Sequence, residues 1–186
     1  MLPIGTKAPE FQLLDTVSKN LIGYQDVRGP KGTVVLFLCN HCPYVIHVNG
    51  ELVNIANTYE EKGIGFVAIS SNDIEKYPLD SPDKMEIVAK VLQYPFPYLY
   101  DESQEVAIAY HAACTPDIYV FDENDLLIYR GRLDDSRPGN GLPLTGKDLR
   151  TALDAVCGLV PVPTTQYPSA GCNIKWKPEN LERINQ

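Results

Sequence analysis

Two cysteines separated by two residues form the pattern with the clearest chemistry in this chain. Cys39-Asn-His-Cys42 follows an apolar, β-branched run, and Pro43 comes next. Proline suits the first helical turn, where no backbone N–H is needed. The pair is therefore expected where a buried strand meets a helix, with both sulfurs on one side of the first turn, able to form a disulfide or stay as a dithiol. Because a helix N-terminus favours the reactive thiolate, the pattern predicts thiol–disulfide chemistry at Cys39 and Cys42.

His41 lies between the two cysteines. A protonated imidazole there would stabilise a thiolate further and, by favouring the reduced form, make the disulfide a stronger oxidant. The alternative is an exposed histidine without a chemical role. A metal module is a further alternative, in which Cys39, Cys42 and a histidine hold copper or zinc. A zinc ribbon needs a second cysteine pair, which the sequence lacks. We expect no metal and no cofactor beyond the redox-active Cys39–Cys42 disulfide.

The elements that would position this pair alternate along the chain. Segment 33–39 lacks polar alternation, as in a strand buried on both faces. Further patterns predict a helix over 45–59, a strand over 65–71, a loop insertion over 72–80, a helix from Ser81-Pro82, a strand over 95–100, a helix over 101–112, a hairpin of 117–122 with 126–132, and a last helix ending near 157. This order predicts an α/β sheet with helices on both sides, made mixed by the hairpin. We expect one redox domain over 1–159, with 160–186 as an extension packed on it.

Thr115-Pro116 is a second chemical signal, because proline directly before a buried strand is a good site for a cis peptide bond. Together with Cys-x-x-Cys it resembles the thioredoxin fold, and within that fold the peroxiredoxin-like AhpC/TSA group. The segments that carry this resemblance are 39–45, 73–80, 129–134 and 171–176. It implies a three-layer α/β/α sandwich with a mixed central sheet, an N-terminal extension and a C-terminal tail. It also implies that Pro116 packs against the disulfide and that Thr115 contributes to partner binding.

The resemblance leaves two orders of attack open. The thioredoxin pattern makes Cys39 the attacker and Cys42 the resolver, and this is our first expectation. The peroxiredoxin pattern reverses them, with Cys42 attacking peroxide. Peroxiredoxins also use a threonine where this chain has Cys39, and an arginine whose place falls near Thr115-Pro116. Thioredoxins carry a buried aspartate in the strand before the motif, whereas segment 34–38 has no carboxylate.

The net charge and the number of cysteines limit the classes of partner that the chain could bind. The chain has 186 residues, with 16 Lys and Arg against 24 Asp and Glu, for a net charge of −8. This balance argues against nucleic acids and anionic membranes, and no apolar run approaches the ~20 residues that span a bilayer. Five cysteines cannot all pair, and Cys157 is expected in the core. Cys114 is either a further redox thiol or a packed one, and Cys172 is a resolving, a packed or an exposed thiol. A cytoplasmic location is the default.

These observations predict a cytoplasmic thiol–disulfide oxidoreductase. Its partners would be protein or small-molecule thiols and disulfides, and the sequence predicts no particular oligomeric state. The alternatives are a thiol peroxidase with Cys42 as the peroxidatic cysteine, and a copper- or zinc-binding module of the same fold.

Overall fold

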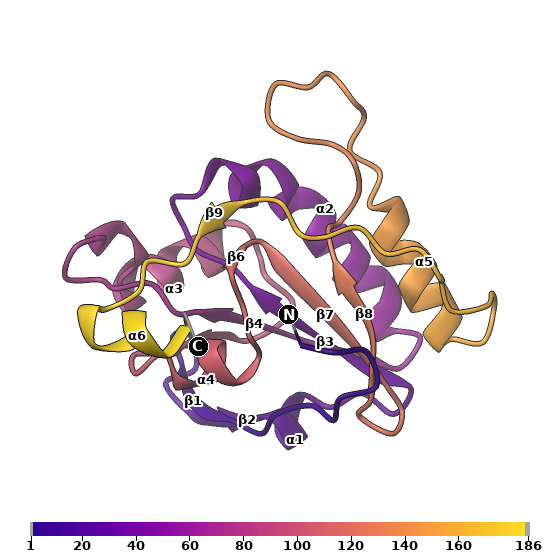
Figure 1. The fold of residues 1–186 in the computed structure, drawn as a ribbon, viewed down its shortest axis with the longest axis horizontal. Helices are drawn as coiled ribbons and strands as arrows, with labels where there is room; N and C mark the ends of the chain where they lie inside the picture. Colours follow the sequence, from indigo (N-terminus) through magenta and orange to yellow (C-terminus); the bar gives the residue numbers. More distant parts are fainter. Residues whose placement is uncertain (1, 185–186) are drawn as a thin grey trace.

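A seven-stranded mixed sheet runs through the middle of the molecule (Figure 1). The structure is a computed structural model that describes residues 2–184. The sheet has the order β2-β1-β5-β4-β3-β7-β8. The strands are β1 (Gln12–Asp15), β2 (Leu21–Gly23), β3 (Gly32–Phe37), β4 (Ile64–Ser70), β5 (Tyr98–Tyr100), β7 (Asp117–Asp122) and β8 (Leu127–Gly131). The β3–β4 and β4–β5 pairs are parallel, whereas the other pairs are antiparallel. The predicted hairpin is thus confirmed as β7 and β8.

Helices cover both faces of the sheet. One face packs against α2 (Pro43–Glu60), α3 (Pro82–Val91) and α5 (Lys147–Val156), and the other against α1 (Tyr24–Val27) and α4 (Glu105–Ala109). Short helices η1 (Pro78–Asp80), η2 (Pro178–Asn180) and α6 (Leu181–Ile184) complete the set. This arrangement confirms the predicted three-layer α/β/α sandwich.

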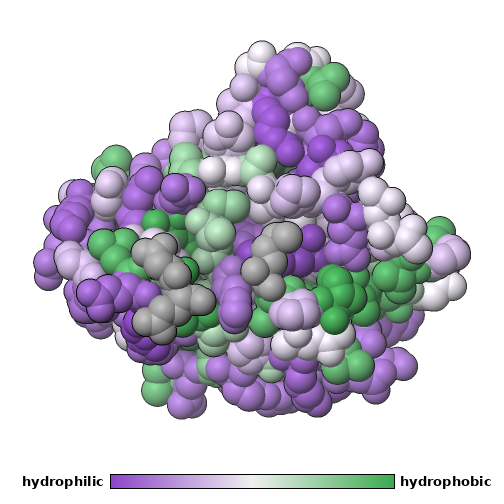
Figure 2. All heavy atoms as spheres, viewed as in Figure 1, coloured by the Kyte–Doolittle hydropathy of each residue, from purple (hydrophilic) through white to green (hydrophobic). Residues whose placement is uncertain are grey.

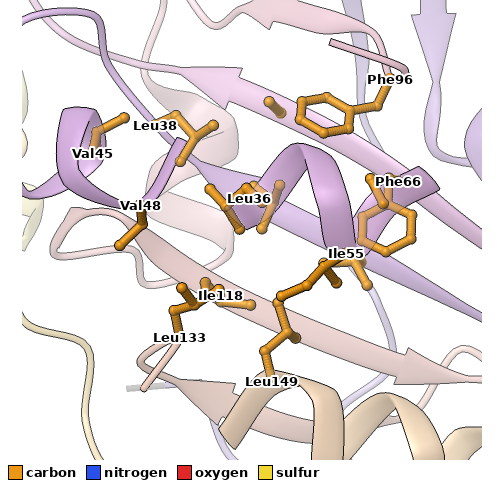
Figure 3. Close-up of a cluster of buried hydrophobic side chains, with 14 of the residues drawn as sticks. Leu36, Leu38, Val45, Val48, Ile55, Phe66, Phe96, Ile118, Leu133 and Leu149 are labelled. Carbon is orange, nitrogen blue, oxygen red and sulfur yellow. The ribbon is translucent and has the colours of Figure 1, made fainter. Parts of the chain in front are cut away.

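The central strand β3 explains why its sequence shows no polar alternation. Successive side chains of a strand point to opposite faces. Val34 and Leu36 therefore enter the core beneath α2, while Val35 and Phe37 enter the core on the other face. Figure 3 shows the first of these cores, where Leu36 and other side chains from the sheet meet those of α2 and α5. The same strand leads directly into the cysteine pair.

Two segments differ from the sequence-based expectation. The N-terminal segment forms a β-hairpin, β1 with β2, that joins the sheet beside β5. Its strands are only four and three residues long and partly exposed, so they carry no clear periodic pattern. Segment 72–80 is not a solvent-exposed insertion throughout, because Asn72, Asp73 and Asp80 are buried. The segment is polar because its buried side chains line one side of the cysteine site.

The tail beyond α5 crosses the molecule as an extended chain, drawn from orange to yellow in Figure 1. It first follows β8, where Gln166 Oε1 accepts from Arg130 N at 3.1 Å and Tyr167 O accepts from Arg132 N at 3.2 Å. It then forms β9 (Cys172–Asn173), which pairs with β6 (Cys114–Thr115) in a small second sheet. Ile174 is buried beyond this point, as its apolar side chain requires.

The face that carries the tail is mostly hydrophilic, with scattered apolar side chains between the polar ones (Figure 2). Among residues 2–184, no helix combines the length and the apolar character that crossing a membrane would demand.

Candidate redox site

The cysteine pair lies at the junction that its sequence predicts. β3 ends at Phe37, and Cys42 is the N-cap residue of α2, with Pro43 in its first turn. Cys39 is 2% exposed and Cys42 is fully buried. Both are free thiols, as are the other three cysteines. The pair is therefore reduced and screened from solvent.

Thr115 contacts both sulfurs of the pair. The Thr115–Pro116 peptide bond is cis, as predicted. Thr115 Oγ1 lies 3.3 Å from Cys39 Sγ, and the Cys42 thiol donates to Thr115 O at 3.2 Å. The structure thus brings Cys39, Cys42 and Thr115 together, with Pro116 next in the chain.

The two thiols of the pair differ in acidity. A hydrogen bond from the Cys39 thiol lowers the pKa of Cys42 to about 4, helped by the side chain and backbone of Cys172 and the backbone of Val45, and opposed by burial. The same hydrogen bond, followed by burial, raises the pKa of Cys39. Donors directed at one sulfur stabilise its charge. Of the two thiols, Cys42 is therefore the one that loses its proton more readily, and it gives up its hydrogen bond to Thr115 O when it does so.

Asp80 is a site residue that the sequence did not reveal. It is fully buried and accepts from the Asn40 backbone N–H at 2.8 Å. His41 Nδ1 lies 2.6 Å from Asp80 Oδ2, with a direction too poor for a hydrogen bond, so this is a charge contact when the imidazole is protonated. His41 is therefore neither free in solvent nor simply paired with a thiolate: it lies between Asp80 and the ring of Tyr77, whose centroid is 5.7 Å away.

Donor atoms of Cys39, His41 and Asp80 all lie within 4.8 Å of one another. Thiolate, imidazole and carboxylate are all zinc ligands, so this triad could hold such an ion. It differs from the ligand set expected from sequence, because Asp80 takes the place of Cys42. A groove of about 780 Å³ adjoins this side of the site, and its walls include Tyr77, Ile174, Lys175 and Trp176.

The remaining cysteines divide into one close thiol and two more distant ones. Cys172 lies opposite Thr115 in the β6–β9 pair, in contact with Cys42, whose pKa it lowers. Burial and this contact raise the pKa of Cys172 to about 11. Cys114 is one residue from Thr115, and burial raises its pKa to about 12. Cys157 is half-buried at the end of α5 and packs against the core, which modifies the expectation that it lies wholly inside it.

A buried ion pair lies next to the cis-proline turn. Asp117 Oδ2 accepts from Arg130 at 2.8 Å, and their side chains are 1% and 6% exposed. Asp117 also accepts from Ser169 Oγ of the tail at 2.6 Å and from Tyr119 OH at 3.0 Å. One carboxylate thus joins the turn, strand β8 and the tail.

Replacing Gly171 with Ala is expected to detach the tail from β6. A Cβ at this position would lie 1.9 Å from Thr115 O and 2.6 Å from Thr115 C, and backbone atoms cannot move aside cheaply. Hydrogen exchange of residues 169–176 should therefore become faster. Gly50→Ala is the control, because no atom lies within 4 Å of its added Cβ. Unchanged protection in Gly171→Ala would contradict this close packing.

The thiolate on Cys42 is expected to form as the pH rises through about 4, where its lowered pKa lies. A group with a depressed pKa is charged at every pH above that value. Absorbance at 240 nm, which reports thiolate, should therefore be present at pH 6 in reduced protein and absent in Cys42→Ser. In the difference between wild type and Cys42→Ser, an absorbance step near the pKa of an ordinary thiol, ~8.5, would show that no such stabilisation exists.

Comparisons of the sequence and the structure with known proteins identify related chains. The AhpC/TSA family model matches residues 4–130. A conserved protein of Geobacillus kaustophilus, described as uncharacterized, is 57% identical, with 96% of this chain and 94% of that one covered and a TM-score of 0.93. A hypothetical protein of Sinorhizobium meliloti 1021 is 43% identical, with 96% and 97% covered and a TM-score of 0.92.

More distant structures share the fold. The thioredoxin domain of a thiol-disulfide oxidoreductase from Bacteroides vulgatus is 18% identical, with 68% of this chain and 86% of that one covered and a TM-score of 0.57. No functionally curated protein sequence matches this chain.

Proposed function

The chain belongs to the AhpC/TSA family, and from this premise we propose that it is a thiol–disulfide oxidoreductase that uses the Cys39–Cys42 dithiol and disulfide. One observation carries the proposal: two adjacent thiols lie against the cis Thr115–Pro116 turn, and one of them, at the start of a helix, has a lowered pKa. Its partners would be protein or small-molecule thiols and disulfides, in a cytoplasmic setting.

The charge distribution supports Cys42 as the nucleophile, the reverse of the thioredoxin order. The Cys42 thiolate attacks one sulfur of a partner disulfide, and the other partner sulfur leaves as a thiolate that takes up a proton. A mixed disulfide between Cys42 and the partner results. Because Cys42 is fully buried, the partner can reach it only after a local displacement of its cover.

Resolution of the mixed disulfide falls to Cys39. Its thiol gives up a proton and attacks Cys42 Sγ, which forms the Cys39–Cys42 disulfide and releases the reduced partner. Asp80 and His41 are close enough to Cys39 to receive that proton, directly or through water. They would take the place of the strand carboxylate that segment 34–38 lacks. The whole sequence is reversible and also oxidises partner dithiols.

The test is a disulfide exchange assay with insulin and dithiothreitol, with oxidation of a reduced dithiol peptide as the reverse assay. Wild-type protein and the control Cys157→Ser should turn over, whereas Cys42→Ser should not. Cys39→Ser combined with Cys172→Ser, which removes both neighbouring thiols, should accumulate the mixed disulfide with its partner on Cys42. If Cys39→Ser and Cys42→Ser both keep the wild-type rate in both directions, the proposal is wrong.

A thiol peroxidase remains the second candidate, favoured by the low pKa of Cys42. The thiolate would attack peroxide to give a sulfenate and water, and a neighbouring thiol would then condense with it. The hydroxyl of Thr115 contacts Cys39 rather than Cys42, so it does not activate this attack directly. Peroxide consumption faster than insulin reduction, lost in Cys42→Ser, would favour this candidate.

Metal binding by Cys39, His41 and Asp80 is a third candidate, carried by the close approach of their donor atoms. Elemental analysis of protein purified under reducing conditions tests it. Stoichiometric zinc or copper that is lost in Asp80→Ala would favour a metal module over the redox enzyme.

A further inference from the structure

Cys172 occupies a position that gives the buried pair a neighbour nearer the surface. In the antiparallel β6–β9 pair it lies directly opposite Thr115, whose carbonyl accepts from the Cys42 thiol at 3.2 Å. Residues directly opposite in such a pair have Cα atoms only ~4.5–5.5 Å apart. The side chain and backbone of Cys172 also lie close enough to Cys42 to lower the pKa of its thiol. Three sulfurs therefore share one site: Cys39, Cys42 and Cys172.

The tail is held firmly enough to keep Cys172 in this place. Gly171 approaches Thr115 so closely that no side chain fits between them. On one side, Ser169 Oγ donates to Asp117 at 2.6 Å. On the other, the Lys175 backbone N–H donates to Asn72 Oδ1 at 2.8 Å. The contact between Cys172 and Cys42 thus belongs to a fixed strand and not to a loose terminus.

The three cysteines differ in how much of each is exposed to solvent. Cys39 and Cys42 are 2% and 0% exposed, whereas Cys172 is only partly buried. A partner thiol can therefore meet Cys172 before it can meet either member of the pair. We propose that Cys172 is a relay thiol, which carries the disulfide between the buried Cys39–Cys42 pair and thiol-containing partners at the surface. This inference rests on the proposed oxidoreductase function.

The relay consists of balanced exchange steps. Cys172 loses its proton and attacks Cys42 Sγ, the Cys39–Cys42 bond breaks, and Cys39 leaves and takes up a proton. No electrons are gained or lost in this step, which only moves the disulfide to Cys42–Cys172. A partner thiolate then attacks the more exposed Cys172 Sγ, and Cys42 leaves. A second partner thiol resolves the mixed disulfide, so that the partner is oxidised to a disulfide and the pair is reduced.

The first experiment looks for the relay disulfide without relying on turnover. One tryptic peptide contains both Cys157 and Cys172, so the double variant Cys39→Ser with Cys157→Ser gives an unambiguous assignment. After oxidation with diamide, mass spectrometry should find most chains with an intramolecular Cys42–Cys172 bond. Adding Cys172→Ser should abolish the cross-link, and adding Cys114→Ser should leave it. A Cys42–Cys114 bond, an intermolecular bond only, or free Cys42 would overturn the proposal.

The second experiment measures exchange in otherwise intact protein. Wild-type chains oxidised at Cys39–Cys42 are mixed with reduced glutathione, and the loss of the disulfide is followed by thiol trapping. Cys172→Ser should react at least about tenfold more slowly, while Cys157→Ser should match wild type. Equal rates for wild type and Cys172→Ser would mean that the partner reaches the pair without the relay.

The two proposals can fail separately. If wild type exchanges disulfides at Cys39–Cys42, but Cys172 neither cross-links nor affects the rate, the relay is wrong and the oxidoreductase stands. If the Cys42–Cys172 bond forms but neither insulin nor peptide is turned over by wild type, the oxidoreductase is wrong, and the relay falls with it as a functional step.

Discussion

The Cys39–Cys42 couple is expected to be more oxidising at pH 7 than a pair of ordinary thiols, by on the order of 90 mV. The pKa of Cys42 is lowered from 9.0 to about 4. At pH 7 this favours the reduced form by roughly 10³-fold, and each tenfold corresponds to about 30 mV for a two-electron couple. Equilibration with glutathione redox buffers, followed by thiol trapping, gives the potential.

The pH dependence of this potential tests its cause. Between about pH 5 and 8, Cys42 is a thiolate and Cys39 stays protonated, so reduction takes up two electrons but only one proton. The potential should then fall by about 30 mV per pH unit, half the ~59 mV expected when both thiols are protonated. Cys157→Ser should give the wild-type slope. A slope near 59 mV throughout would show that Cys42 is not the stabilised thiolate.

The second large effect is expected from Asp117→Ala, which should lower the free energy of unfolding by about 3–5 kcal/mol. The change leaves the buried Arg130 guanidinium without its carboxylate, and breaking such a pair costs far more than breaking one at the surface. It also removes the acceptor for Ser169 and Tyr119. Urea unfolding of the reduced protein, followed by circular dichroism, measures the change.

A surface pair supplies the matched control for Asp117→Ala. Asp135 pairs with Lys147 at 2.6 Å, but both side chains are more than a third exposed. Asp135→Ala should therefore unfold at nearly the wild-type urea concentration. If Asp117→Ala behaves like Asp135→Ala, the buried pair does not hold the turn in place. Asp117→Asn, which keeps the shape but removes the charge, should fall between the two.

The parts of the fold and site that could be predicted from sequence depend on local patterns. The apolar run into Cys39, the Cys-x-x-Cys spacing and the proline at 116 each carry their signal within a few residues. They were enough for the thioredoxin-like sandwich, the AhpC/TSA resemblance and the cis peptide bond, all of which are confirmed. The order of attack within the pair stays a prediction, because it depends on hydrogen bonds from distant segments.

The missed features depend on contacts between distant segments. Asp80 stands in a polar stretch that looks solvated, and only the fold places it against His41 and Cys39. The sequence names Cys172 as one of two further candidate thiols but does not choose between its possible roles, because its register is set by the close approach of Gly171 to Thr115. No periodic pattern records such an approach, so only the structure places this sulfur beside the pair.

The path of the tail along β8 has a consequence for how copies of the chain behave toward one another. β8 is the last strand of the sheet, and an open edge strand is a template for pairing with another molecule. Gln166 and Tyr167 occupy the backbone groups of Ile128, Arg130 and Arg132 that would otherwise serve this purpose. The segment that brings Cys172 to the pair therefore also protects the molecule from edge-to-edge aggregation, and chains shortened before Gln166 should self-associate through β8.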